Sequence, residues 1–119
     1  MAGEGSLRIN ISSTRDNTTF SRSFTDTFDV GASSGLLTRQ NIGTSDETLS
    51  LGDVSSNGYI FIKNCDATNY VELGHTSGTY FGRLNAGEGA VFRCGAALTA
   101  IHAKANTGAC DVEYLLLSN

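Results

Sequence analysis

The chain has no proline and no tryptophan, and it has only two histidines among its 119 residues. Positive charge is also scarce, because the eight Lys and Arg residues are scattered singly and the formal net charge is −4. Most affinity for nucleic acids comes from clustered basic side chains that neutralise phosphates, so direct binding to DNA or RNA is not expected. The histidines and cysteines lack the spacing of metal ligands, and no metal or cofactor site is expected either.

Long apolar runs are missing as well. No apolar run exceeds four residues, the length of residues 114–117, whereas a membrane-spanning helix needs roughly 20, so no membrane segment is expected. Residues 1–6 lack the basic and apolar parts of a secretory signal, which predicts synthesis in a cytoplasm. In that reducing compartment, the odd number of cysteines (Cys65, Cys94 and Cys110) favours free, buried thiols over disulfides, although the sequence leaves their state open.

Short β-prone runs separated by polar turns take the place of helices. Residues 7–11 alternate between apolar and polar, as in a half-buried strand, and residues 20–30 keep their apolar side chains on one parity. Arg22 and Asp26 interrupt that apolar face. Six further runs lie at 59–63, 70–73, 79–84, 90–94, 98–104 and 111–117.

Eight to ten short strands at intervals of about 8 to 12 residues, without helices between them, predict an all-β fold. We expect an antiparallel β-sandwich that is jelly-roll-like. Residues 1–119 are expected to form a single sandwich domain. Residues 1–12 are either an N-terminal arm or the first strand of the sandwich, and the first strand is favoured.

Catalysis by side chains needs a nucleophile, a base and a group that orients the base. The nearest approach to such a set is Glu72, His75 and His102. Glu72 and His75 have opposite parity in a β-prone run, although Gly74 between them can bend the chain, and His102 has the setting of a packing residue. We therefore expect no catalytic residue and a chain that is not an enzyme.

A carbohydrate-binding β-sandwich is one alternative function. Such sandwiches bind glycans through exposed tyrosines and polar side chains, and Tyr59, Tyr70 and Tyr80 are the candidates here. Aromatic side chains on strands more commonly pack at the edge of the core.

Three phrases within residues 59–117 resemble small β-rich proteins from the structural gene regions of tailed bacteriophages and prophages. Residues 64–74 (NCDATNYVELG) are similar to a strand and turn with the pattern TNYVE-G. Residues 84–93 (LNAGEGAVFR) are similar to an L-PGE-ALLR hairpin, with Ala86 in place of the proline. Residues 103–114 (AKANTGACDVEY) are similar to a closing AKA-T…(D)LEY hairpin. The first half of the chain shows no such likeness.

The resemblance implies a virion structural protein without catalytic residues. The first expectation is a capsid decoration (cement) protein on the outer capsid surface, which binds the major capsid protein or other virion proteins and stabilises contacts between capsomers. The alternative is a tail, baseplate or fibre-associated attachment module. We expect a homo-oligomer, a dimer or a trimer, because cyclic oligomers match the local axes of a shell. Repeated weak contacts hold such an assembly, since neighbouring copies raise the effective concentration.

Two segments are candidates for the assembly contacts. Residues 6–12 can add as a strand to a neighbouring sheet, and the small-residue loop 31–35 can become ordered on contact. The residues expected to make these contacts are Leu7, Ile9, Ile11, Ser33, Ser34 and Leu36.

Overall fold

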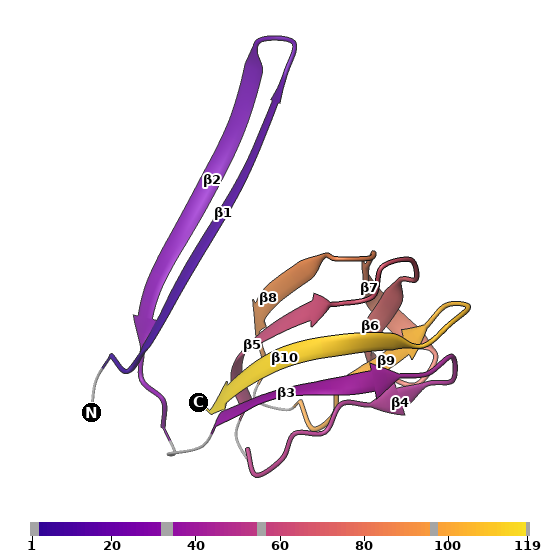
Figure 1. The fold of residues 1–119 in the computed structure, drawn as a ribbon. Coiled ribbons are helices and arrows are strands. Elements are labelled where there is room, and N and C mark those ends of the chain that lie inside the picture. Colours follow the sequence, from indigo (N-terminus) through magenta and orange to yellow (C-terminus); the bar gives the residue numbers. More distant parts are fainter. Residues whose placement is uncertain (1–2, 32–34, 55–56, 96–97, 119) are drawn as a thin grey trace. The chain divides into compact units, whose positions relative to one another are not determined.

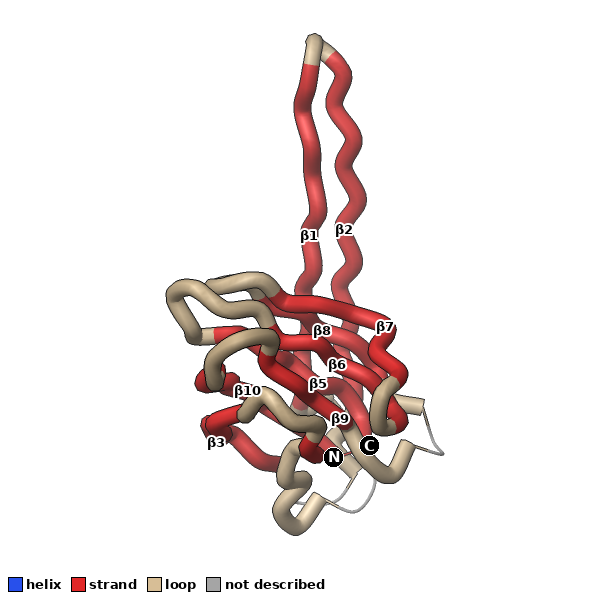
Figure 2. The backbone as a smooth tube through the Cα atoms, turned by 90° about the vertical axis from the view of Figure 1, so that its right-hand side faces the viewer, coloured by secondary structure: helices blue, strands red, loops and turns tan. Residues whose placement is uncertain are grey.

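The computed structural model describes residues 3–31, 35–54, 57–95 and 98–118. These residues form ten β-strands, every pairing is antiparallel, and no helix occurs among them (Figures 1 and 2). The predicted all-β antiparallel fold is thereby confirmed. No helix suited to crossing a membrane is found in this part of the chain.

The chain divides into two compact units, residues 1–31 and residues 32–119. The first unit contains β1 (Gly5–Arg15) and β2 (Thr18–Phe28), which form a two-stranded sheet of their own. Of residues 1–12, those from Gly5 onward therefore lie in a hairpin strand that extends to Arg15. The expectation of one domain over the whole chain stays a prediction.

A two-residue turn produces the long β1–β2 hairpin. Asp16 and Asn17 have φ angles of 51° and 66°, and positive φ at both central positions is the signature of the type I′ turn that matches strand twist. The strands then pair without a break from Arg15 opposite Thr18 to Gly5 opposite Phe28. A Cβ at Gly5 would overlap the ring of Phe28, so glycine allows this ring to lie across the strand.

The second unit contains two four-stranded sheets. Its strands are β3 (Gly35–Ile42), β4 (Glu47–Thr48), β5 (Asn57–Asn64), β6 (Val71–Thr76), β7 (Thr79–Leu84), β8 (Gly89–Arg93), β9 (His102–Ala105) and β10 (Cys110–Ser118). One sheet has the order β3-β10-β5-β8 and the other has the order β4-β9-β6-β7 (Figure 1). The chain therefore crosses repeatedly from one sheet to the other, which is how a β-sandwich closes around one core.

Apolar side chains from both sheets fill the core of the second unit. The alternation is clearest in β10, where Val112, Tyr114 and Leu116 are fully buried and the residues between them are partly exposed. Ile60 and Ile62 of β5 are also fully buried in this cluster. The hydroxyl of Tyr114 donates to the carbonyl oxygen of Ser50 at 2.6 Å, so its polar end is satisfied inside the core.

The three cysteines are free thiols, as the sequence favoured. Cys94 and Cys110 are buried in the sandwich, and Cys65 is partly exposed. Burial raises the pKa of both the Cys94 and the Cys110 thiol, because the thiolate is poorly solvated there. They act as small apolar side chains of the core.

Asn64 is a fully buried polar residue at the end of β5. Its side-chain amide donates to the carbonyl oxygens of Asn69, at 2.9 Å, and Leu84, at 3.1 Å. Its side-chain oxygen accepts from the backbone N–H of Asp66 at 2.9 Å. One side chain thus ties β5 to the turn that follows it and to the end of β7.

We predict that Asn64→Ala lowers the free energy of unfolding by about 1–3 kcal/mol or more, since it leaves buried backbone groups without partners. Urea unfolding followed by circular dichroism measures the change. Asn41→Ala is the control, because Asn41 is exposed and bonds the Asp111 carboxylate on the surface, and it should change stability by less than about 0.5 kcal/mol. Equal effects of the two substitutions would contradict this role.

Candidate functional site

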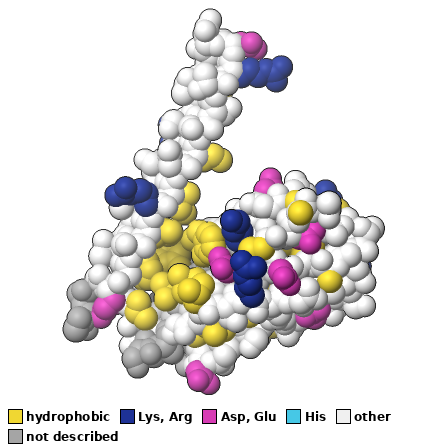
Figure 3. All heavy atoms as spheres, in the orientation of Figure 1, with side chains coloured by type: hydrophobic (Ala, Val, Ile, Leu, Met, Phe, Trp, Pro, Cys, Tyr) yellow, Lys and Arg dark blue, Asp and Glu magenta, His cyan; other side chains and the backbone are white. Residues whose placement is uncertain are grey.

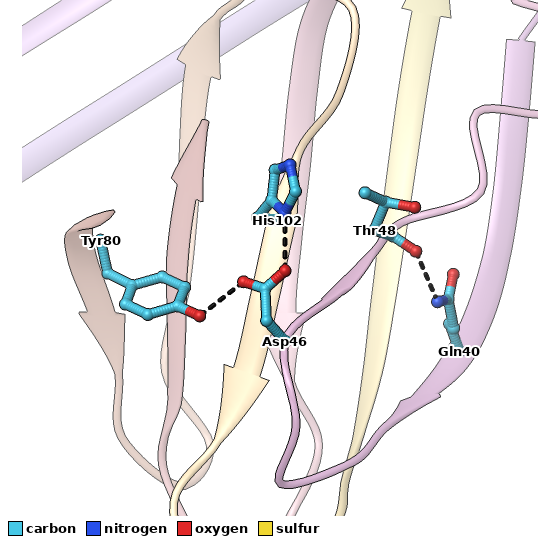
Figure 4. A network of polar contacts seen from close by, with 5 residues as sticks. All are labelled: Gln40, Asp46, Thr48, Tyr80 and His102. Atoms are coloured by element: carbon cyan, nitrogen blue, oxygen red, sulfur yellow. Dashed lines mark hydrogen bonds and ion pairs between the residues drawn. The ribbon is translucent and has the colours of Figure 1, made fainter. Parts of the chain in front are cut away.

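Asp46 joins three parts of the sandwich through its carboxylate (Figure 4). It lies between β3 and β4, accepts a hydrogen bond from the Tyr80 hydroxyl of β7 at 2.5 Å, and lies 2.8 Å from Nδ1 of His102 in β9. The side chains of Asp46 and His102 are only 19% and 18% exposed. Gln40 bonds the carbonyl oxygen of Thr48 beside this group and fastens β3 to β4.

The electrostatics of this cluster keep the Asp46 carboxylate ionised and the Tyr80 hydroxyl protonated at neutral pH. The hydrogen bond from Tyr80, followed by that from His102, lowers the pKa of Asp46. The same contact with Asp46 raises the pKa of Tyr80. Both pKa values move away from neutrality, whereas a general acid or base works best with a pKa near the working pH.

Of the sequence set Glu72, His75 and His102, the register places Glu72 and His102 at diagonal positions on one face of the β6–β9 pair, but the hydrogen-bond partner of His102 is Asp46. In the register of β6 and β9, His102 lies opposite Gly74, and Glu72 lies opposite Lys104. Asp46 is 56 positions away from His102 and carried no local signal. In the part of the chain that the structure describes, no group of three His, Cys, Asp or Glu residues is arranged to hold a metal ion.

The three tyrosines considered for sugar binding are engaged by their own chain. The Arg83 guanidinium lies 4.0 Å from the centre of the Tyr70 ring, and that of Arg93 lies 5.3 Å from the centre of the Tyr59 ring. The Tyr80 hydroxyl is bonded to Asp46. A sugar would therefore compete with cation–π contacts for the ring faces.

The β1–β2 hairpin has one apolar face, which we call the hairpin face. Strand alternation and the register place on it Leu7, Ile9, Ile11, Phe20, Arg22, Phe24, Asp26 and Phe28. The opposite face carries Ser, Thr and Asn side chains and Arg8. Ile11 and Phe20 are each 71% exposed and Phe24 is 49% exposed, so the hairpin face is largely open to solvent.

The sandwich has an apolar surface of its own, on the outer side of the β3-β10-β5-β8 sheet. The register places Leu37, Leu115, Phe61 and Val91 in one row across the four strands, which we call the outer row. Leu37 is 69% exposed and Phe61 is 37% exposed. On the face of the sandwich that Figure 3 turns to the viewer, basic and acidic side chains lie beside hydrophobic ones.

Charged side chains border the outer row. The next row across the same sheet is formed by Arg39, Glu113 and Lys63, and the Arg39 and Glu113 side chains form an ion pair of 3.8 Å. An apolar strip with a polar border is the composition of a protein–protein contact surface.

The expected assembly residues fall in different environments. Leu7, Ile9 and Ile11 lie together on the hairpin face, where Leu7 is half-buried and the other two are exposed. Leu36 is partly buried and packs against the sandwich core. Ser33 and Ser34 lie outside the described residues. These contacts stay predictions, because no partner is present.

Sequence reasoning missed the outer row and half of the hairpin face. The parity of Phe20, Phe24 and Phe28 was visible, and Asp16-Asn17 was the turn signal that would have joined them to residues 7–11. The apolar run 114–117 was the signal that one strand has apolar side chains on both faces.

Comparisons of the chain with protein-family models, with curated proteins and with solved structures gave no match.

We predict that Asp46→Asn destabilises the protein at neutral pH and that the difference from the unchanged protein shrinks in acid. The folded pKa of Asp46 is lowered, below the unfolded value of about 3.9. Its stabilising contribution is therefore present above the unfolded pKa and is lost as the pH falls through the folded pKa. Urea midpoints of both proteins at neutral pH and at about pH 3 measure this.

Asp53→Asn supplies the control, since Asp53 is an exposed aspartate of the same unit. It should leave the midpoint unchanged at both pH values. A constant difference between Asp46→Asn and the unchanged protein, independent of pH, would show that the lowered pKa does not contribute.

Proposed function

We propose that the chain is a virion structural protein, a capsid decoration protein that binds the outer shell and stabilises contacts between capsomers. The observation that carries the proposal is the outer row, an exposed apolar strip on a closed sandwich that its own unit leaves uncovered. A decoration protein gains its function from such repeated surface contacts and needs no reacting group.

We infer further that the sandwich is a jelly roll. It has eight strands in two four-stranded antiparallel sheets, and its first strand β3 pairs with its last strand β10. The second strand, β4, pairs with the second-last strand, β9, in the other sheet. This nested order supports a jelly roll, a fold that virus capsid domains share with lectins.

The net charge of the chain supports a position on the outer face of the shell rather than inside it. The formal net charge is −4, which disfavours the neighbourhood of packaged DNA. Lys63 beside the outer row provides a local exception, whereas Arg39 in the same row is paired with Glu113. Lys63 would help orient an acidic surface of the major capsid protein on the row, because complementary charges fix orientation more than affinity.

Copy number per particle separates a decoration protein from a tail, baseplate or fibre module. Quantitative mass spectrometry of purified particles of the virus that encodes the chain gives the ratio to the major capsid protein. A ratio set by the shell's repeated positions supports decoration, and a few copies per particle would replace this proposal with the tail alternative.

We predict that Leu37→Asp weakens binding to shells. Particles lacking the protein are mixed with the purified chain and sedimented, and the bound copies are counted. A carboxylate placed in an apolar contact loses its hydration, so we expect at least about a tenfold loss of affinity. Leu37 is 69% exposed, so the fold should be retained.

Phe81→Asp is the matched control, because Phe81 is 66% exposed and lies on β7 of the other sheet. It should bind shells as the unchanged chain does. Thermal unfolding of both variants shows whether the sandwich is intact. Equal binding by Leu37→Asp and the unchanged chain would overturn the assignment of the outer row.

A further inference from the structure

The hairpin face has a charge pattern that is complementary to itself. Along β2 it reads Phe20, Arg22, Phe24, Asp26, Phe28, with equal two-residue steps on either side of Phe24. A rotation about Phe24 therefore exchanges the outer phenylalanines with each other and exchanges the positive with the negative position.

The paired strand β1 obeys the same symmetry. Ile9 lies opposite Phe24, and Ile11 and Leu7 lie at equal steps on either side of it. Each charged residue of β2 thus has an aliphatic partner on β1, Ile11 for Arg22 and Leu7 for Asp26.

The hairpin needs a cover for this face. A two-stranded hairpin alone is at best marginally stable in water, because it has no second layer to bury its apolar side chains. Its exposed side chains include Ile11, Phe20 and Phe24, and a shallow hollow of about 230 Å³ lies between Ile9, Ile11 and Phe24.

We propose that the hairpin faces of two copies of this chain pack on each other around a twofold axis at Phe24 and Ile9. The axis lies between the two hairpins and runs across their strands, so β2 lies over β2 of the second copy in the opposite direction. Arg22 then faces Asp26 of the second copy, and Asp26 faces its Arg22. The same surface serves both copies, as in the common isologous dimer.

The geometry of packed sheets permits this arrangement. Two sheets stack about 10 Å apart, and a long arginine side chain and an aspartate reach towards each other across that gap. The ring of Phe24 and the side chain of Ile9 fill the centre. The phenylalanines at positions 20 and 28 lie at the two ends, so the apolar surface is covered over its whole length.

Charge selects this axis over the other way to stack two hairpins. An axis that runs along the strands would place β2 over β1 of the second copy. Residues at the same position along the hairpin would then lie side by side in the two copies. Arg22 would then lie beside Arg22 of the second copy, and Asp26 beside its Asp26. Like charges at one level of an apolar interface repel each other strongly, so the crossed arrangement is the favoured one.

The pair of charges also explains why an apolar face is interrupted. Buried ion pairs add little net stability but fix register and partner when they are formed, and they penalise every arrangement that leaves them unpaired. Here they would set the antiparallel orientation of the two hairpins.

The dimer deepens the proposed function, on which its use in a shell rests, but its formation is tested on the purified full-length chain. Sedimentation equilibrium over a concentration series measures the dissociation constant. Arg22→Asp and Asp26→Arg are each expected to weaken self-association at least about tenfold, because each places like charges opposite one another.

Mixing the two variants is the decisive step. Arg22→Asp carries two acidic positions on the hairpin face and Asp26→Arg carries two basic ones. The mixture should associate as the unchanged chain does, with one copy of each variant in every dimer. The double variant Arg22→Asp/Asp26→Arg should also self-associate again.

Arg8→Asp is the matched control, since this substitution makes the same change of charge on the polar face of the hairpin. It should leave the dissociation constant unchanged, apart from a small long-range effect removed by salt. Thermal unfolding confirms that the sandwich of every variant is intact.

Three results would overturn the proposal. They are an unchanged chain that stays monomeric up to about millimolar concentration, single variants that self-associate normally, and a mixture that fails to associate. If the chain does not dimerise but binds shells normally, the dimer is wrong and the proposed function stands. If the chain dimerises normally but does not bind shells, the proposed function is wrong and the dimer stands.

Discussion

The two-residue period of a β-strand decides which surfaces this protein can bury by itself. In β10 the residues Val112, Tyr114 and Leu116 fill the core, and Leu115 between them emerges on the opposite face. Because β10 pairs with β3 on one side and β5 on the other, that outward leucine becomes part of an apolar row across the sheet. A two-layer sandwich covers only the inner face of each sheet, so the outer row stays on the surface of its own unit.

The polar groups inside and at the edge of the sandwich serve its rigidity. Asn64 bonds the backbone of distant segments from within the core, and Asp46 joins the β3–β4 segment to β7 and β9. In both cases a single side chain makes hydrogen bonds to several groups that water would otherwise solvate. Separating these segments would break all of those bonds together. For the function proposed above, such rigidity would favour binding, because little ordering entropy is lost on contact.

The local parts of the fold could be predicted from the sequence, and the non-local parts could not. The run 79–84 coincides with β7, and 111–117 lies inside β10, because period-two alternation is a local signal. The predicted run 98–104 begins too early, since β9 covers only His102–Ala105. The link between Asp46 and His102 depends on how β4 pairs with β9, and strand pairing between distant segments leaves no mark in either segment alone.

An exposed apolar hairpin face is prone to associate with the wrong partners. An uninterrupted row of phenylalanines and isoleucines on a two-stranded sheet would adhere to any exposed sheet, the outer row of a neighbour included. Arg22 and Asp26 penalise such contacts, because a charged side chain loses its hydration in an apolar contact. In the proposed dimer, each of these charges lies opposite one of the other sign. Their positions on either side of Phe24 therefore narrow the set of partners by means of charge, while the phenylalanines and aliphatic side chains supply the attraction.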